Sequence, residues 1–277
     1  MATARQLRLA RELRTLRERA GLNATQAAQH LGIRQTQISN MEAARIGVSP
    51  ERVRALAALY ECPDEAYVQA LARMTERRRG WWEEYRGVLP DGLLDLAELE
   101  HHGTGLRTAH TSHIPGLLQT VEHAREIYRQ AIPELSPPAI EHRISHRIKR
   151  QAVLHGPDPV RYRAIVHEAA LRMRFGGLPV VRGQLDHLLK MSELTHIELR
   201  VIPFSAGSYP GSGQTINYVS GPVPQLDTVQ LDQSHGVVFL GEEERLTQYR
   251  LLFERLEGLA LQRAESAEFI RQIAASL

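Results

Sequence analysis

The feature that most constrains the fold is a pair of adjacent alanines followed by a glycine, in the sequence NATQAAQHLG at residues 23–32. Ala27 and Ala28 are expected on the inner face of a short helix, where their small side chains let another helix approach closely. Gly32 then supplies a tight turn, because glycine adopts left-handed backbone conformations without a steric penalty. The pattern predicts two short helices joined by a glycine turn.

Helical spacing of apolar residues predicts five helices in this first part of the chain. The first covers residues 5–20, carries an apolar stripe at spacings of four, three and four, and ends before Gly21. Asn23 and Ser49 are the expected N-caps of the second and fourth helices, and the fifth follows Asp64. The expected inner positions are Leu9, Leu13, Leu16, Ala20, Ala27, Ala28, Leu31, Ile38, Met41, Val53, Leu56, Ala57, Tyr60, Tyr67, Val68, Leu71 and Met74.

The third helix, predicted over residues 35–44 with Ile38 and Met41 inside, has an unusually polar outer face. Its uncharged hydrogen-bonding side chains are Gln35, Thr36, Gln37 and Asn40. A solvated surface helix usually carries Lys and Glu, whereas amides can bond adenine N6 and N7 in pairs, and a threonine methyl can contact thymine. The sequence therefore predicts a helix-turn-helix domain whose third helix reads bases in the major groove. The alternative is a helical bundle with a polar surface helix.

Charge is distributed unevenly along the chain. The formal net charge is +2, but residues 1–80 hold 14 Arg and no Lys against 8 acidic residues, a balance of +6. The remainder holds 20 basic and 24 acidic residues, a balance of −4. This uneven distribution of charge indicates that the first domain binds a polyanion, and the alternative is chance clustering. Arg34 and Arg45, at either end of the third helix, are expected to reach phosphates or a guanine.

This segment resembles the Xre-type (Cro/repressor-like) regulators through LARELRTLRERAGL and AAQHLGIRQTQISNMEAARIGVSPERVRALAALY. The resemblance covers about residues 5–75. It implies that the four polar residues of the third helix read bases and that the start of the second helix binds phosphate. Many members carry Thr-Gln at that start, where this chain has Asn23 and Ala24, so Thr25 and Gln26 are expected to substitute in part.

A change of character in TERRRGWWEEYRGVLPDGLLDL marks a predicted domain boundary. Residues 1–76 form the predicted helix-turn-helix domain, 77–90 a linker, and 91–277 a second domain for sensing and dimerisation. Arg77–Arg79 are interpreted as a solvated hinge, with a phosphate-seeking arm as the alternative. Trp81 and Trp82 are expected to anchor a helix on a core.

The second domain mixes strand and helix patterns. GLRTAHTSHIPGLLQ is predicted as a strand leading into a turn, and VRYRAIVHEAALRMRF as a buried strand followed by a helical turn. Four further strands are predicted in IELRVIPF, GQTINYVS, DTVQLDQ and GVVFLG. Helices are predicted in TVEHAREIYRQAI, SPPAIEHRISHRIKRQAVL, VVRGQLDHLLKMSEL and the last 36 residues. The fold class is thus an all-α five-helix domain followed by an α+β domain with a mixed or mainly antiparallel sheet.

The second domain resembles the C-terminal domain that follows Xre-type heads in an actinobacterial class of antitoxin-like, or WhiJ-like, regulators. The resemblance covers most of residues 81–277. It rests on HIPGLLQTVEHAR, HRIKRQAVL, VHEAALRMRFGG, QLDHLL, LRVIPFSAGSYPG and FERLEGLAL. It implies a transcriptional regulator, often paired with a small protein encoded nearby, and no established catalytic residues.

Three patterns in the second domain could carry other chemistry. His142 and His146 are four apart on a predicted helix, as in a two-ligand metal face, but four cations surround them: Arg143, Arg147, Lys149 and Arg150. That basic helix is interpreted as a solvated face, with an anionic ligand or acidic partner as the alternative. Arg107, Ser112 and Glu242–Glu244 can be combined into a transferase-like site, although no spacing demands it. The expectation is a protein without catalytic residues, cofactor or metal.

Together these patterns predict a sequence-specific DNA-binding transcriptional regulator. It is expected to be a homodimer on an inverted repeat of double-stranded DNA, modulated by a small partner protein or small-molecule ligand. The single cysteine, Cys62, and the lack of a long apolar run fit a cytoplasmic protein with no membrane contact. The alternative is an antitoxin-like protein-interaction module that binds a small partner protein, with DNA binding as secondary autoregulation.

Overall fold

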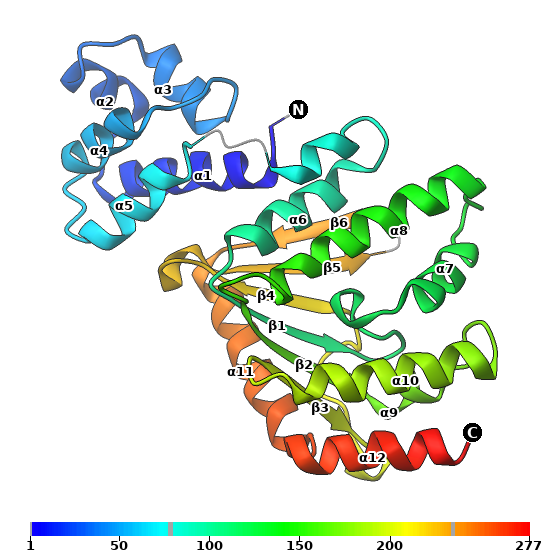
Figure 1. Ribbon diagram of the computed structural model, residues 1–277. Coiled ribbons are helices and arrows are strands. Elements are labelled where there is room, and N and C mark those ends of the chain that lie inside the picture. The colour runs from blue at the N-terminus through cyan, green and yellow to red at the C-terminus, as the bar shows by residue number, and fades with distance from the viewer. Residues whose placement is uncertain (1, 77–79, 234–235) are drawn as a thin grey trace. The chain divides into compact units, whose positions relative to one another are not determined.

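A computed structural model describes residues 2–76, 80–233 and 236–277 (Figure 1). The chain divides into two compact units, residues 1–80 with 222–225 and residues 81–221 with 226–277. The arginine hinge predicted at Arg77–Arg79 lies outside the described residues. Among the described helices, none combines the length and hydropathy needed to cross a bilayer.

The described part of the first unit contains five helices that begin where the sequence predicts. Asn23, Ser49 and Asp64 cap the second, fourth and fifth of them, each accepting a hydrogen bond from the backbone N–H three residues on, at 2.9, 3.2 and 2.9 Å. The helices are α1 Ala4–Arg19, α2 Ala24–His30, α3 Gln35–Glu42, α4 Pro50–Leu59 and α5 Glu65–Arg73.

The core of the first unit forms from the predicted inner faces, except that Ala20, predicted inside, caps the C-terminus of α1 and is exposed. Leu13, Ala27, Ile38 and Leu71 are each no more than 1% exposed, so α1, α2, α3 and α5 share one apolar interior. The predicted alanine pair is buried, since Ala28 is only 2% exposed. The five-helix fold is therefore confirmed.

A mixed six-stranded sheet runs through the described part of the second unit, in the order β3-β2-β1-β4-β5-β6. Strands β1, β2 and β3 pair in parallel with one another, whereas the pairs β1–β4, β4–β5 and β5–β6 are antiparallel. The sequence predicts either a mixed or a mainly antiparallel sheet, and the structure shows a mixed one. The strands are β1 Gly105–His110, β2 Arg161–His167, β3 Ile197–Ile202, β4 Ile216–Ser220, β5 Thr228–Gln233 and β6 Gly236–Leu240.

Helices cover both faces of the sheet (Figure 1). The described helices of this unit are α6 Asp91–His102, α7 Val121–Arg129, α8 Pro137–Gln151, α9 Glu168–Arg172, α10 Leu178–Glu193, α11 Glu243–Leu259 and α12 Arg263–Ala275. One face packs apolar side chains against α10 and α12, and the other packs against α11. Helix α6 was not predicted, because Pro90 and Gly92 at its start are typical of a turn.

The tryptophan pair lies in a short 3₁₀ helix, η1 Trp81–Tyr85. Trp82 is 2% exposed and packs with Tyr85 and with Leu94 and Ala97 of α6. The Tyr85 hydroxyl also meets the Ser145 hydroxyl of α8 at 2.7 Å. Trp82 therefore anchors η1 on a core, as the sequence predicts.

Candidate nucleic-acid interface

Helix α3 is fixed to the first unit through apolar contacts and one buried ion pair. Ile38 and Met41 are 1% and 5% exposed. Arg17 of α1 binds the Glu42 carboxylate of α3 through two hydrogen bonds of 2.7 and 2.8 Å and donates a third to the Leu22 carbonyl at 2.7 Å. The bond to Glu42 raises the pKa of Arg17. A two-point ion pair of this geometry holds α3 at a fixed angle.

A left-handed residue ends each helix of the helix-turn-helix. Gly32 ends α2 at φ 62°, and the Ile33 N–H donates to the carbonyl five residues back at 3.0 Å. The same turn ends α3, where Ala44 has φ 53° and the Arg45 N–H donates to the carbonyl five residues back at 2.9 Å. Helix α3 thus stops at Glu42, two residues before its predicted end.

The predicted base-reading residues lie on the outer side of α3. Gln35, Thr36 and Gln37 are exposed and Asn40 is half-buried. Gln35 donates to the Ser39 hydroxyl at 2.7 Å, and the Gln37 carbonyl accepts from the N-cap backbone of its own helix at 3.0 Å. Thr36 and Asn40 have no side-chain hydrogen bond to any residue that the structure describes. The geometry leaves these two, and the Gln37 amide N–H₂, available to a ligand.

The predicted phosphate contacts are also exposed. Thr25 and Gln26 lie in the first turn of α2, where the Gln26 carbonyl accepts from the Asn23 backbone at 2.8 Å. That bond leaves the Gln26 amide donors free to meet an anion. Arg34 and Arg45 form no ion pair within the described ranges. All eight side chains are placed on the surface, and their contacts with DNA stay predictions.

The Arg17–Glu42 pair was missed from the sequence. Its only signal is that Arg17 falls on the apolar stripe of α1, four residues after the buried Leu13. Nothing in the spacing connects it with a carboxylate 25 residues away. Neither residue is expected to touch DNA, because both support α3 from its inner side.

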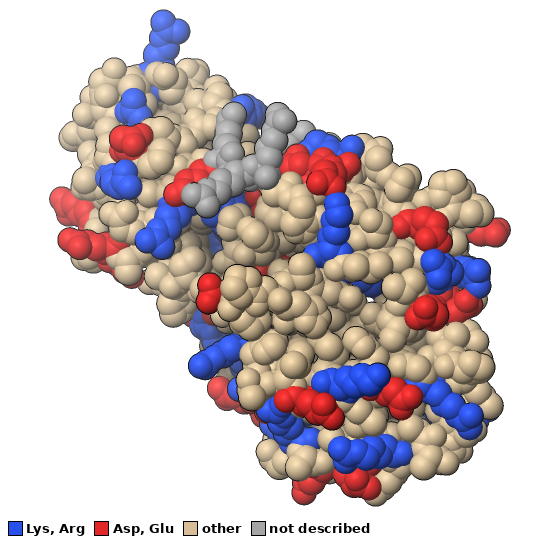
Figure 2. All heavy atoms as spheres, viewed as in Figure 1, with Lys and Arg blue, Asp and Glu red and all other residues tan. Residues whose placement is uncertain are grey.

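The basic helix α8 differs from the predicted solvated face. His142 is exposed, whereas His146 is 2% exposed, so the two do not form one ligand face. Arg150 is buried in a two-point ion pair with Glu100, at 2.6 and 2.8 Å. Lys149 remains on the surface beside Glu84. On the face shown in Figure 2, acidic and basic side chains of the second unit lie interspersed.

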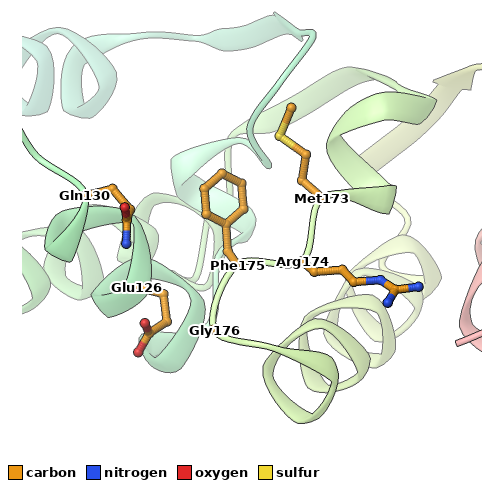
Figure 3. Close-up of a pocket in the computed structure, with 6 residues that line it drawn as sticks. All are labelled: Glu126, Gln130, Met173, Arg174, Phe175 and Gly176. Atoms are coloured by element: carbon orange, nitrogen blue, oxygen red, sulfur yellow. The ribbon is translucent and has the colours of Figure 1, made fainter.

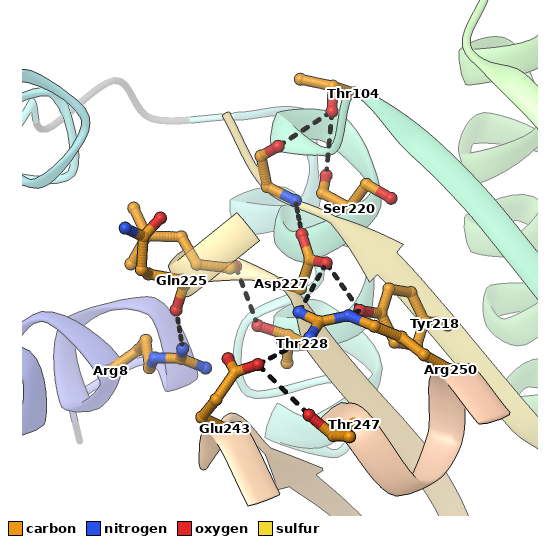
Figure 4. Close-up of polar contacts among 12 residues, drawn as sticks. Arg8, Thr104, Tyr218, Ser220, Gln225, Asp227, Thr228, Glu243, Thr247 and Arg250 are labelled. Atoms are coloured by element: carbon orange, nitrogen blue, oxygen red, sulfur yellow. Dashed lines mark hydrogen bonds and ion pairs between the residues drawn. The ribbon is translucent and has the colours of Figure 1, made fainter. Parts of the chain in front are cut away.

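The three parts of the hypothetical transferase site do not form one site. The Arg107 guanidinium lies 4.3 Å from the Tyr218 ring centre. Figure 4 shows the Tyr218 hydroxyl, which accepts a hydrogen bond from Arg250 at 2.8 Å. Arg250 also pairs with Glu243 at 2.7 Å. Burial raises the pKa of Tyr218 to about 12. The Ser112 hydroxyl instead forms a hydrogen bond with the neighbouring His113 ring at 3.1 Å. The contacts among Tyr218, Arg250 and Glu243 therefore connect α11 to the sheet, and Ser112 takes no part in them.

Comparison with known families matches both units. A family described as a helix-turn-helix domain matches residues 8–71, which confirms the predicted motif. No curated protein and no solved structure matches the chain. A second family, described as a domain of unknown function (DUF5753), matches residues 93–272. Because this match spans more than half of the sequence, the chain belongs to the DUF5753 family and carries a helix-turn-helix domain before it.

Proposed function

We propose that the protein is a sequence-specific transcriptional regulator of the Xre (Cro/repressor) type. Residues 1–76 bind double-stranded DNA, and residues 91–277 dimerise and respond to a small partner protein or ligand. The observation that carries the proposal is the outer face of α3. It presents exposed amides and a threonine from a helix that Arg17 and Glu42 hold rigidly on α1.

The side chains of α3 suit direct readout for a physical reason. Amide groups can donate and accept at adjacent atoms of one base edge, and each good two-point contact discriminates by about 1–3 kcal/mol. A solvated helix gains nothing from replacing Lys and Glu with such groups. The excess of arginine in the first eighty residues supplies the phosphate attraction that brings the helix to the duplex.

A dimer follows from the size of the reading surface. One helix of eight residues can reach only a few base pairs, which leaves little discrimination against the rest of a genome. Two half-sites one helical turn apart multiply the discrimination. We therefore propose an inverted repeat as operator and assign dimerisation to the second unit.

Selection from random duplex DNA with the full chain tests the proposal. We expect an enriched inverted repeat, bound by the parent and by Gln69→Glu, a control on the exposed side of α5. Asn40→Glu should abolish binding, because a carboxylate on the outer face of α3 would meet base acceptors and phosphates. Absence of any enriched sequence contradicts the proposal. A small protein that co-purifies stoichiometrically would then favour the interaction-module alternative.

A further inference from the structure

A row of polar side chains interrupts the apolar face of the sheet. Thr108, Asn217 and Gln230 are direct neighbours across β1, β4 and β5. Thr108 donates to Asn217 at 2.8 Å, Asn217 to Gln230, and Gln230 to Asp232 at 2.7 Å. The polar side chains of this row therefore have hydrogen-bond partners within the row. His110, two residues after Thr108 and on the same face of β1, does not join the row.

Two buried histidines lack partners beside this row. His110 is 7% exposed and His123 of α7 is 2% exposed, and all four ring nitrogens are buried without a hydrogen bond. Burial, with His113 and the charge of Arg147 nearby, lowers the pKa of His110 to about 3 and that of His123 to about 4. Both rings are therefore neutral at pH 7, and each offers one N–H donor.

Arg147 of α8 supplies a positive charge that acts on both rings. Its guanidinium donates to Gln119 and lies 4.6 Å from the Tyr128 ring centre, while its Nε is buried without a partner. No carboxylate in the described ranges lies within ion-pair distance of it. Burial lowers the pKa of Arg147. Arg150, one turn along the same helix, shows the contrast, because it is fully paired with Glu100.

An open pocket of about 370 Å³ lies beside Phe175, whose ring links it to His123. Its lining residues are Glu126, Gln130, Met173, Arg174, Phe175 and Gly176. The Phe175 ring stands between Gln130 and Met173 in Figure 3 and contacts the His123 ring, at 5.5 Å between centres. The one carboxylate in this lining, Glu126, is neutralised by Arg129 at 2.6 Å.

We propose that His110, His123 and Arg147, the Arg147 cluster, bind the oxyanion group of a small ligand whose body lies against Phe175. Unpaired buried donors each cost about 1–3 kcal/mol, and a phosphate or carboxylate would satisfy several of them together. A metal ion is the wrong ligand, because the arginine charge would repel it. The proposal rests on and deepens the proposed function, in which the second unit responds to a ligand.

Calorimetric titration of the full chain without DNA tests the site. The probes are inorganic phosphate, adenosine monophosphate and benzoate, which separate free phosphate from a phosphorylated ring and from an aromatic carboxylate. We expect saturable binding of at least one probe at millimolar concentration. Arg147→Gln should weaken it by about 10- to 100-fold, the effect of one lost charge-assisted hydrogen bond. Arg271→Gln, at an exposed ion pair on α12, is the matched control and should bind like the parent.

A second measurement does not depend on any variant. As the probe is added, the ring-nitrogen NMR signals of His110 and His123 in the parent protein should shift. The shifts should follow the same saturation curve as the heat of binding measured by calorimetry. The inference is overturned if no probe binds, if Arg147→Gln binds as tightly as the parent, or if both histidine signals stay unchanged. Ordered water would then be the partner of these groups. Such a failure leaves DNA binding intact, whereas failure of the proposed function shows in the DNA selection alone.

Discussion

The outer face of α3 and the Arg147 cluster are both sets of polar groups with unused hydrogen-bonding capacity, but they differ in their surroundings. Thr36 and Asn40 reach solvent, so water satisfies them at no cost. The rings of His110 and His123 are buried, where each unmet group lowers stability by about 1–3 kcal/mol. Exposed polar residues are retained freely, whereas buried unpaired ones need a reason, and a ligand supplies one.

The arginines sharpen this contrast. Arg17 and Arg150 are buried and each binds a carboxylate through two hydrogen bonds. Arg147 donates to an amide oxygen and lies over an aromatic ring, and the carboxylates of Asp232 and Glu100 act on it only from beyond ion-pair distance. The two ion-paired arginines stabilise the fold, and Arg147, which has no carboxylate partner among the described residues, is the one that we propose binds a ligand.

The largest expected effect is the loss of a buried partner. Glu100→Ala leaves Arg150 buried without a counter-charge and should lower the free energy of unfolding by about 3–5 kcal/mol in urea denaturation. Glu268→Ala removes an exposed partner of Arg271 and should cost about 0–1 kcal/mol. Equal losses in the two variants would show that burial does not separate these pairs.

Substitution of two amide residues of α3 should distinguish an effect on base reading from an effect on stability. Gln37→Ala and Asn40→Ala should each weaken binding to the selected operator by about 1–3 kcal/mol in a fluorescence titration. Only Gln37→Ala should also lower stability, by about 1 kcal/mol, because it removes the bond at the N-cap of α3. Gln69→Ala is the matched control. Unchanged operator binding in both α3 variants would contradict the base-reading assignment.

Acid should destabilise the second unit through its buried histidines. His123 has a folded-state pKa of about 4, whereas its usual pKa is 6.5. Between these two pH values the unfolded chain therefore binds a proton at His123 and the folded chain does not. Its contribution to stability is full above about pH 6.5 and is lost as the pH falls toward 4, with a slope of about 1.4 kcal/mol per pH unit. His123→Gln should reduce that slope in urea denaturation. The exposed His142→Gln should leave it unchanged, and the reverse result would refute the burial argument.

The smallest expected effect concerns a phosphate contact. Arg45→Ala should weaken binding to operator and to unrelated DNA alike and reduce the salt slope of the binding constant by about 1, because one fewer counterion is released. Titrations at several salt concentrations measure the slope. If preference is lost at a single base position instead, Arg45 reads a base and its assignment changes.

Most of the first unit could be predicted from the sequence. The helix starts, the glycine turn and the alanine pair all depend on contacts within a few residues, which spacing and capping residues reveal. The end of α3 was placed two residues late, because Ala44 in a left-handed turn has no sequence signal of the kind that Gly32 provides. In the second unit the strands were found, but their order was not, since pairing joins segments far apart in the chain.

The sequence alone determined that α3 has a polar outer face, because helical periodicity places side chains without any knowledge of distant contacts. Only the tertiary structure decided which charges are paired. Arg147 and Arg150 are three residues apart on one basic helix, yet Glu100, some fifty residues earlier in the chain, reaches only the second. Burial and pairing are properties of the folded environment, so the difference between a structural arginine and a candidate ligand-binding one appears only after the chain has folded.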